Sequence, residues 1–303
     1  MEYRTIGPLR VSLAGLGCNN FGARLDAAAT ETVVRAALEE GVNFFDTADI
    51  YGGTRSEEYL GAALGPVRDE VVIATKFGHQ VGDDPSHKGG SARWIASAVE
   101  GSLRRLATDR IDLYQMHVPD PAVPIEETLD ALDALVRAGK VRAIGHSNFD
   151  AVQIERAARV ASERGTVPFV SAQNHYNLLH RDAEIDVLPA CERSGLSVLP
   201  YFPLASGLLT GKYRRGEQPP PNTRIAQWSD ERRASTLTDA TFDAVDILTS
   251  WAAARAMSLQ AVAIAWLAAN PSVASVITGA TSPDQAVANA RAARAELQTL
   301  LDG

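Results

Sequence analysis

Short apolar runs alternate with longer amphipathic segments along almost the whole chain. The runs are rich in Val, Ile and Phe, as buried strands are, whereas in the longer segments apolar residues recur at helical spacing. The expected strands are residues 42–45, 71–75, 111–116, 142–145, 169–172, 197–199 and 273–277, and the expected helices are residues 30–40, 56–64 with Ser56 as N-cap, 94–106, 125–138, 151–161, 185–194, 242–255 and 262–269. Strand followed by helix, repeated this often, predicts an α/β fold with a parallel sheet.

Two segments depart from this alternation. Residues 4–6 and 10–12, joined by Gly7 and Pro8, predict a β-hairpin that would close the floor of a barrel. Residues 203–235 contain scattered glycines and a run of prolines at 219–221, and such a long irregular insertion is usually a lid or a disordered linker. Its apolar residues favour a lid. Length alone would fit one barrel or two ordinary domains, but no Ser- or Pro-rich linker divides the chain, so we expect a single domain over residues 1–303.

Composition excludes several classes of protein. The net charge of −8 is spread along 303 residues without a run of Lys or Arg, which argues against nucleic acid as a partner. The chain has no apolar run long enough to span a membrane, and its start is unlike a signal peptide. With only Cys18 and Cys191, both expected to be buried apolar residues, a cytoplasmic location is expected. The sequence does not specify an oligomeric state.

Four chemically active residues follow three of the expected strands. Asp46 and Tyr51 follow residues 42–45, Lys76 follows 71–75, and His117 follows 111–116. The C-terminal ends of parallel barrel strands converge on one mouth, so these residues can meet around one substrate. A phenol has a pKa near 10, and a neighbouring ammonium at Lys76 should lower the pKa of Tyr51. Asp46 would keep Lys76 charged, and His117 would orient a carbonyl oxygen or relay a proton.

Each of these residues, taken singly, also has a structural reading, such as a buried Asp–Lys pair or a histidine bonded to the backbone. The four together at strand ends favour a general acid for carbonyl reduction, which in turn requires a hydride donor. A metal-dependent hydrolase is not supported, because no His-x-His or clustered His/Asp set falls at the strand ends. We therefore expect no metal.

Over nearly its whole length the chain resembles the aldo-keto reductases. The matching stretches are residues 46–52 with Ser56 and Glu57, Lys76 and His117 at their strand ends, 145–149, Gln173 with Asn174, and 279–283. Residues 199–213 are similar to the branch that contains bacterial reductases and potassium-channel β subunits. The resemblance implies a (β/α)8 TIM barrel with an N-terminal hairpin, a long lid loop after strand 7, and a nicotinamide cofactor, usually NADPH. It makes Tyr51 the general acid, with Asp46, Lys76 and His117 completing a tetrad.

The resemblance also implies a cofactor site. Ser147, Asn148 and Gln173 would bind the carboxamide, and Tyr201 would stack on the nicotinamide ring. The remaining cofactor positions it implies are Asp46, Pro203, Leu204, Ala205, Gly207, Lys212, Arg224, Gly279, Thr281, Gln285 and Asn289. Gly15 and Gly17 look like part of a dinucleotide fingerprint, but a third glycine does not follow and the context is a barrel strand.

Departures from the family pattern affect the cofactor and the substrate. Many relatives have a lysine at Gly279, an arginine at Gln285 and a glutamate at Ala288. NADPH is still favoured over NADH, because Lys212 and Arg224 can supply charge. The expected substrate is a small carbonyl compound, with a sugar, a dicarbonyl and an aromatic aldehyde all left open. The residues expected to face it are Asn19, Phe21, Phe77, Val118 and Trp228. The alternative function is a cofactor-binding regulatory subunit similar to potassium-channel β subunits.

Overall fold

The computed structural model describes residues 1–295, and its centre is a sheet of eight parallel strands. Neighbouring strands of the sheet follow one another in the chain, and the last strand pairs with the first. The strands are β3 (Ala14–Gly17), β4 (Phe44–Asp46), β5 (Val72–Phe77), β6 (Ile111–Met116), β7 (Val141–Ser147), β8 (Ser171–Gln173), β9 (Ser197–Val198) and β10 (Val276–Gly279). The predicted (β/α)8 barrel is confirmed.

The two edge strands of this sheet meet, so the sheet closes on itself. The N–H of Val198 donates to the carbonyl of Ser272 at 2.8 Å, and the N–H of Ala274 donates to the carbonyl of Val198 at 3.0 Å. Pairing at this seam satisfies groups that an open edge would leave exposed. The sequence predicts the last strand at residues 273–277, whereas the structure places it at Val276–Gly279 and leaves Val273 as an isolated bridge to Val198.

The N-terminal hairpin closes the floor of the barrel, as predicted. Strands β1 (Tyr3–Ile6) and β2 (Leu9–Ser12) pair antiparallel, and Gly7 provides the left-handed turn residue with φ 52°. Ile6, Leu9 and Val11 are almost completely buried and pack against the inward side chains of the strands. The hairpin therefore fills the end of the barrel opposite to the C-terminal ends of the parallel strands.

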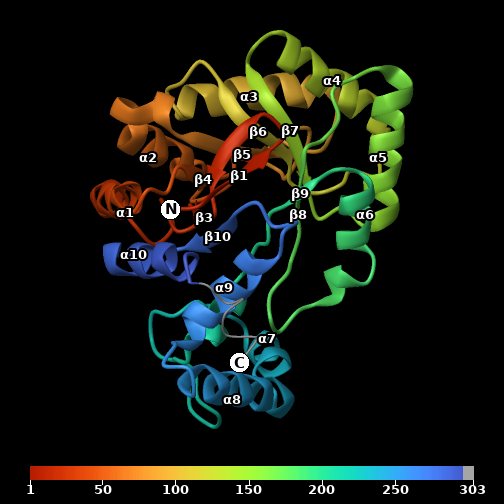
Figure 1. The fold of residues 1–303 in the computed structure, drawn as a ribbon. Helices are drawn as coiled ribbons and strands as arrows, with labels where there is room; N and C mark the ends of the chain where they lie inside the picture. The colour runs from red at the N-terminus through yellow and green to blue at the C-terminus, as the bar shows by residue number, and fades with distance from the viewer. Residues whose placement is uncertain (296–303) are drawn as a thin grey trace.

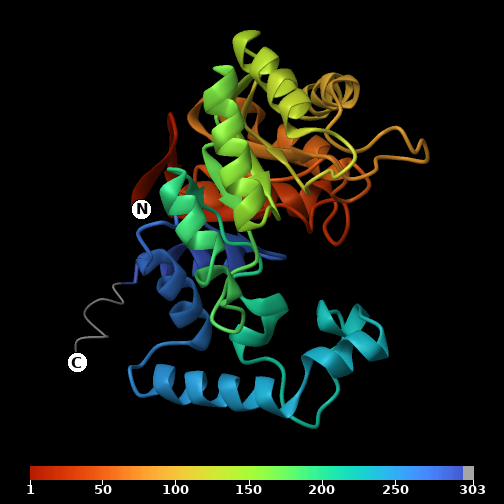
Figure 2. The same cartoon turned by 90° about the vertical axis from the view of Figure 1, so that its right-hand side faces the viewer.

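Helices surround the barrel on its outer side (Figure 1). They are α1 (Ala27–Glu39), α2 (Arg55–Leu64), α3 (Ala92–Arg105), α4 (Ile125–Arg137), α5 (Ala151–Arg164), α6 (Val187–Arg193), α9 (Leu259–Ala269) and α10 (Pro283–Ala292), with short 3₁₀ turns η1 (Gly65–Glu70) and η2 (Asp182–Glu184). Helix α8 (Asp239–Ala253) extends away from the barrel wall (Figure 2). None of the helices in residues 1–295 is long and apolar enough to cross a bilayer.

The start of α2 differs from the prediction. Ser56 is not the N-cap, because the helix begins at Arg55 after Thr54, which has a left-handed φ of 78°. The hydroxyl of Ser56 instead pairs with the hydroxyl of Thr47 at 2.8 Å and lies 2.8 Å from the carbonyl of Cys18. Ser56 therefore ties α2 to the loops that follow β3 and β4, and both loops reach the mouth of the barrel.

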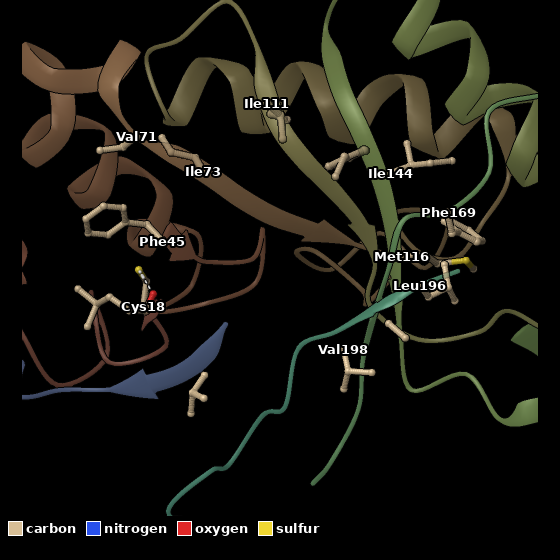
Figure 3. Packing of buried hydrophobic residues seen from close by; sticks show 14 of the residues in the cluster. Cys18, Phe45, Val71, Ile73, Ile111, Met116, Ile144, Phe169, Leu196 and Val198 are labelled. Atoms are coloured by element: carbon tan, nitrogen blue, oxygen red, sulfur yellow. Dashed lines mark hydrogen bonds between the residues drawn. The ribbon is translucent and has the colours of Figure 1, made fainter. Parts of the chain in front are cut away.

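Alternation along the strands separates an inner core from an outer core. Successive strand residues point to opposite faces of a sheet. Phe44 and Leu113 point into the barrel and share a cluster with the hairpin. Phe45, Ile73 and Ile144 point outward and pack beneath the helices (Figure 3). Gly15 of β3 points inward, where a Cβ would lie 2.8 Å from the hydroxyl of Ser275, which explains this glycine without a dinucleotide fingerprint.

The segment after β9, the seventh strand of the barrel, is the predicted lid. It contains the 3₁₀ turns η3 (Ala205–Thr210) and η4 (Ile225–Gln227) and a helix that the sequence does not predict, α7 (Asp230–Thr236). Leu208, Tyr213 and Ile225 are buried together with Phe242 of α8, so the segment is packed rather than loose. Helix α8 thus serves as the support of the lid.

Candidate active site

The polar residues of the site occupy inward positions at the C-terminal ends of the strands. Asp46, Lys76 and Gln115 each lie two residues beyond an inward-pointing apolar residue of β4, β5 or β6, and residues two apart share a face. Ser147 ends β7 with the same parity. Strand geometry therefore brings side chains from distant parts of the sequence to one end of the barrel.

Lys76 and Asp46 form a fully buried ion pair. The ammonium donates to Oδ2 of Asp46 at 2.6 Å and to the carbonyl of Thr47 at 2.9 Å. Oδ1 of Asp46 accepts the side-chain amides of Gln115 at 3.1 Å and Gln173 at 2.9 Å. A buried ion pair is tolerated when its remaining lone pairs and protons are satisfied, and this network satisfies the carboxylate. The pair is consequently fixed in position.

Tyr51 lies against this pair, with Nζ of Lys76 5.1 Å from the centre of its ring. Burial alone lowers the pKa of Lys76, but the attraction of Asp46 and Tyr51 outweighs it and leaves that pKa raised. Burial also raises the pKa of Tyr51, and the charge and hydrogen bond of Lys76 offset this only in part. The lowered phenol pKa that the sequence predicts is wrong, because the prediction does not include the burial of the ring.

His117 stands beside the phenol in a neutral state. Its ring centre is 5.8 Å from that of Tyr51 and 4.4 Å from that of His79, both edge to face. The pKa of His117 is lowered to about 2, mainly by burial and then by the positive charge of Lys76 and the neighbouring His79. Its Nδ1 is buried and, among residues 1–295, has no hydrogen-bond partner. A neutral imidazole beside the phenol can bind a carbonyl oxygen through one N–H group.

A cavity of about 670 Å³ opens above these residues and extends beneath the lid. That volume is typical of sites for small organic molecules. The structure brings the following predicted residues together in its wall: Asn19, Asp46, Tyr51, His117, Ser147, Asn148, Gln173, Tyr201, Pro203, Leu204, Gly207, Lys212, Arg224, Gly279, Thr281, Gln285 and Asn289. Lys76 lies behind this wall, in contact with the wall residues Asp46 and Tyr51.

Five predicted residues lie elsewhere. Phe21 and Phe77 are fully buried in the core, and Phe77 stacks on Tyr114 at 4.7 Å. Trp228 packs with the lid and with Arg232, whose guanidinium lies 4.0 Å above its ring. Ala205 begins η3 of the lid and packs against the apolar residues of the lid, and Val118 is half-buried outside the cavity wall. Of the predicted substrate residues, Asn19 alone lines the cavity.

Tyr201 forms one side of the cavity and is held in a hydrogen-bond chain. Its hydroxyl donates to Oδ1 of Asn148 at 2.9 Å. The amide of Asn148 donates to the carbonyl of His117 at 2.9 Å and to the hydroxyl of Ser147 at 3.0 Å, and Ser147 donates to the carbonyl of Gln173 at 2.7 Å. Asn148 has a left-handed φ of 62°, and strained residues of this kind occur often at functional sites.

Three cations surround the part of the cavity beneath the lid. Arg24 comes from the loop between β3 and α1, and Lys212 and Arg224 come from the lid. Within residues 1–295, none of the three has a carboxylate within salt-bridge distance. The pKa of Lys212 is lowered, mainly by partial burial and then by repulsion from Arg24 and Arg224. The pKa of Arg224 is also lowered, mainly by burial and then by repulsion from Arg24. Such a group of uncompensated cations is suited to an anion.

The sequence did not single out several residues of this wall. Arg24 was missed because it precedes α1 in a loop without a distinctive pattern, and its guanidinium donates to the carbonyl of Asn222 in the lid. Gln260 of α9 donates to Oδ1 of Asn289 at 2.6 Å. Gln115, which lies behind the wall on Asp46, could have been found from its inward parity two residues before His117. The other missed wall residues are Gly17, Cys18, Asn20, Phe202, Ser206, Thr210, Asn222, Thr223 and Ile277.

The fold and this site define an α/β barrel whose chemistry lies at the C-terminal ends of its strands, beneath a lid from its seventh strand. A family model described as the aldo/keto reductase family matches residues 14–299. The chain therefore belongs to the aldo-keto reductases, a family of oxidoreductases that use nicotinamide cofactors, and the predicted resemblance is confirmed.

The similar proteins include a probable channel subunit as well as an oxidoreductase and a reductase. The chain is 39% identical over 300 residues to the probable voltage-gated potassium channel subunit beta of Oryza sativa subsp. japonica, covering 96% of this chain and 91% of that protein. It is 37% identical to the uncharacterized oxidoreductase YrpG of Bacillus subtilis, covering 94% and 89%. It is 31% identical to the L-glyceraldehyde 3-phosphate reductase of Escherichia coli O157:H7, covering 96% and 87%.

Proposed function

We propose that this protein is an NADPH-dependent reductase of aldehydes or ketones in which Tyr51 donates the proton. The observation that carries the proposal is the phenol of Tyr51 on the cavity wall, backed by the buried pair of Lys76 and Asp46. The cations beneath the lid support the cofactor assignment, because a dinucleotide brings phosphate groups to a site that has no carboxylate partner of its own within the described residues.

The residues of the site suit an acid better than a base. Because its pKa is raised, Tyr51 keeps its proton at neutral pH and can donate it to a carbonyl oxygen. The ammonium of Lys76 then stabilises the phenolate that remains, at a position where burial makes that interaction stronger than in water. His117, being neutral, binds the same oxygen without competing for the proton.

The cavity also fits the cofactor. The reduced nicotinamide supplies the hydride that a carbonyl carbon receives. Tyr201 offers a ring face for it, and Gln173, whose amide nitrogen is bound to Asp46, keeps its amide oxygen for the carboxamide. Gly17 and Gly279, which end β3 and β10, line the cavity without side chains. Thr281 and Gln285 at the start of α10 would hold the adenosine end.

The experiment that tests the function measures the loss of NADPH absorbance with a panel of carbonyl compounds. The panel includes sugars, small dicarbonyls, aromatic aldehydes and a short phosphorylated aldehyde, because one relative is named as a reductase of such a compound. Quenching of tryptophan fluorescence on addition of NADPH measures binding separately. Binding without turnover of any member of the panel would contradict the proposed activity.

We expect a lower KM for NADPH than for NADH. Arg24, Lys212 and Arg224 replace the positive charge that Gly279 and Gln285 do not provide, so the extra phosphate of NADPH should gain one or more charge-assisted hydrogen bonds. We expect a KM ratio of about tenfold, corresponding to about 1.4 kcal/mol. Steady-state kinetics with both cofactors at a saturating carbonyl concentration measures it, and a preference for NADH would overturn the assignment.

Replacing Arg24 with Gln should raise the KM for NADPH by about three- to tenfold, because a partly exposed cation and its bond to Asn222 are lost. Arg35→Gln is the matched control, since Arg35 is exposed on α1, pairs with Glu31 and lies outside the cavity. The increase should diminish at high salt. Equal KM values for the two variants would show that Arg24 does not contribute to cofactor binding.

A second candidate function is a regulatory subunit that binds the cofactor, since one similar protein is named as a probable channel subunit. That function requires the cavity but not the acid. It predicts tight binding of NADPH with no turnover of any panel compound, and an unaltered affinity for NADPH in the Tyr51→Phe variant. Turnover of a panel compound by the wild-type protein therefore separates the candidates, because both predict that Tyr51→Phe keeps its affinity for NADPH.

A further inference from the structure

Behind Tyr201 lies a stack of aromatic rings that the proposed chemistry does not use. The ring of His175 lies 5.3 Å from that of Tyr201 at an interplanar angle of 8°. The ring of His180 lies 3.9 Å from that of His175 at 15°. Three nearly parallel rings from two connections of the barrel thus form one column, and only Tyr201 among them lines the cavity.

The register of the barrel produces the first contact of this column. His175 and Tyr201 are bridge partners in a parallel pairing that continues β8 and β9, and the N–H of Tyr201 donates to the carbonyl of Asn174 at 3.1 Å. Directly paired residues on one face of a sheet lie close enough for their rings to stack. His175 therefore covers one face of Tyr201, and Tyr201 also lines the cavity.

The turn at residues 177–180, which follows His175, fixes the position of its ring. Asn177 and His180 exchange backbone hydrogen bonds of 3.1 and 3.0 Å, which bring His180 onto the outer face of His175. The side-chain amide of Asn177 lies 3.1 Å from Nε2 of His175. Because an amide nitrogen only donates, Nε2 accepts, and the imidazole is held as the neutral form with its proton on Nδ1. Burial and then the neighbouring His180 lower the pKa of His175 to about 4, which also favours the neutral ring.

The same turn holds the residue after Tyr201. Asn177, which is completely buried, donates to the carbonyl of Phe202 at 2.9 Å. Phe202 has a left-handed φ of 52°, and a non-glycine residue is held there only when its surroundings determine its conformation. The ring of Phe202 also meets His175 and Tyr201 edge to face, at 5.7 and 5.2 Å. The turn therefore constrains Tyr201 from its side chain and from the backbone that follows.

We propose that His175 is a positioning residue for the reduction: its neutral ring, braced by His180 and Asn177, holds Tyr201 in the single orientation that presents the nicotinamide to the carbonyl carbon. This rests on the proposed function. His175 neither lines the cavity nor contacts the acid, so it acts through the wall residues that it contacts, chiefly Tyr201 and, edge to face, Phe202. Hydride transfer depends steeply on the separation and alignment of the reacting atoms, and a small tilt of the supporting ring affects it more than it affects cofactor binding.

The test compares His175→Leu with His175→Phe in the full chain. Leu removes the flat ring, and we expect kcat to fall by about tenfold while the Kd for NADPH changes by less than about threefold. The primary deuterium isotope effect with NADPH deuterated at the transferred position should increase, since hydride transfer becomes slower relative to the other steps. Phe restores a flat ring without the hydrogen bond to Asn177, and it should recover most of the lost kcat.

Two further variants keep the comparison decisive. His180→Leu removes only the outer ring, which is half-buried, and should lower kcat in the same direction by about two- to threefold. His87→Leu is the matched control, because it removes a histidine stacked on Trp94 at 4.8 Å outside the cavity wall, and it should leave kcat unchanged. Wild-type kcat and isotope effect in folded His175→Leu would overturn the proposal, as would a Phe variant as impaired as Leu.

Failure of the proposed function would be recognised separately. If the wild-type protein turns over no carbonyl compound, the fluorescence lifetime of bound NADPH still reports how rigidly the nicotinamide is held. The lifetime should then shorten in His175→Leu relative to the wild type and His175→Phe. Equal lifetimes in the three proteins would overturn the positioning role without reference to catalysis.

Discussion

Replacement of Tyr51 with Phe should lower kcat by about a hundred- to ten-thousand-fold, the contribution usual for a positioned general acid. The substitution removes one hydroxyl and keeps the ring that packs 5.8 Å from His117 and 5.1 Å from the ammonium of Lys76. The phenol is the group on the cavity wall that burial keeps protonated, and Lys76 stabilises it once the proton has left. Steady-state kinetics with the best carbonyl of the panel measures the loss.

The Kd for NADPH should stay within about twofold of the wild-type value in this variant, because the cofactor contacts are made by other residues. Tyr59→Phe is the control: Tyr59 lies on α2, outside the cavity wall, and should retain full turnover. Near-normal kcat in Tyr51→Phe would show that another group donates the proton. A loss of kcat together with a large loss of NADPH binding would indicate a disturbed cavity rather than a missing acid.

The sequence predicts the positions of the polar residues at the mouth of the barrel well, because strand parity and strand ends determine them. Asp46 ends β4 and Lys76 is the last inward-facing residue of β5, and this follows from a period of two and from the convergence of parallel strands. Gln115 follows the same parity, but nothing in its chemistry marks it until its amide is found on Asp46. The alternation along a strand thus predicts which face of the sheet a side chain occupies. Its hydrogen-bond partner depends on how the strands are brought together in the closed barrel.

The loops are harder to predict. The sequence predicts that Phe21 and Phe77 face the substrate, yet both are buried in the core beneath the helices. Phe77 is the last residue of β5, and because it follows the inward-pointing Lys76 it points to the opposite face of the sheet. Arg24 carries no local signal at all, since its role depends on a contact with Asn222, which lies far along the chain. The pKa of Tyr51 is a similar case: the neighbouring charge can be inferred from the sequence, whereas the burial that opposes it cannot.

His146 occupies an unfavourable position in the core, and its replacement should stabilise the protein. Both ring nitrogens are buried and, within residues 1–295, neither has a hydrogen-bond partner. The ring lies between Phe149, stacked at 4.4 Å, and Phe169, edge to face at 5.1 Å. A buried polar group without a partner costs about 1–3 kcal/mol. A Leu at this position keeps most of the volume and contacts of the ring and removes that cost.

The gain in stability should depend on pH. Burial lowers the pKa of His146 to about 3, below its ordinary value of about 6.5 in the unfolded chain. Between these values the unfolded state binds a proton that the folded state does not, so the histidine destabilises the fold progressively as the pH falls below about 6.5. At pH 5.5 this linkage amounts to about 1.4 kcal/mol, and it is nearly absent at pH 7.5.

The comparison must be made between variant and wild type at each pH, because other buried groups oppose or add to this effect. Burial, then Glu57, raises the pKa of Asp49 to about 8, so Asp49 stabilises the folded state as the pH falls over the same interval. His117, with its pKa lowered to about 2, acts in the same direction as His146. Both remain in His146→Leu, and their contributions cancel in the difference.

Urea unfolding of His146→Leu and wild type at pH 7.5 and 5.5 measures the effect. The variant should be more stable by about 1–3 kcal/mol at pH 7.5, and its advantage should grow by about 1.4 kcal/mol at pH 5.5. His79→Leu is the contrasting variant: burial also lowers the pKa of His79, but its ring is only half-buried, so the change with pH should be smaller. A stability difference independent of pH would mean that the ring of His146 gains a proton or a partner in the folded protein.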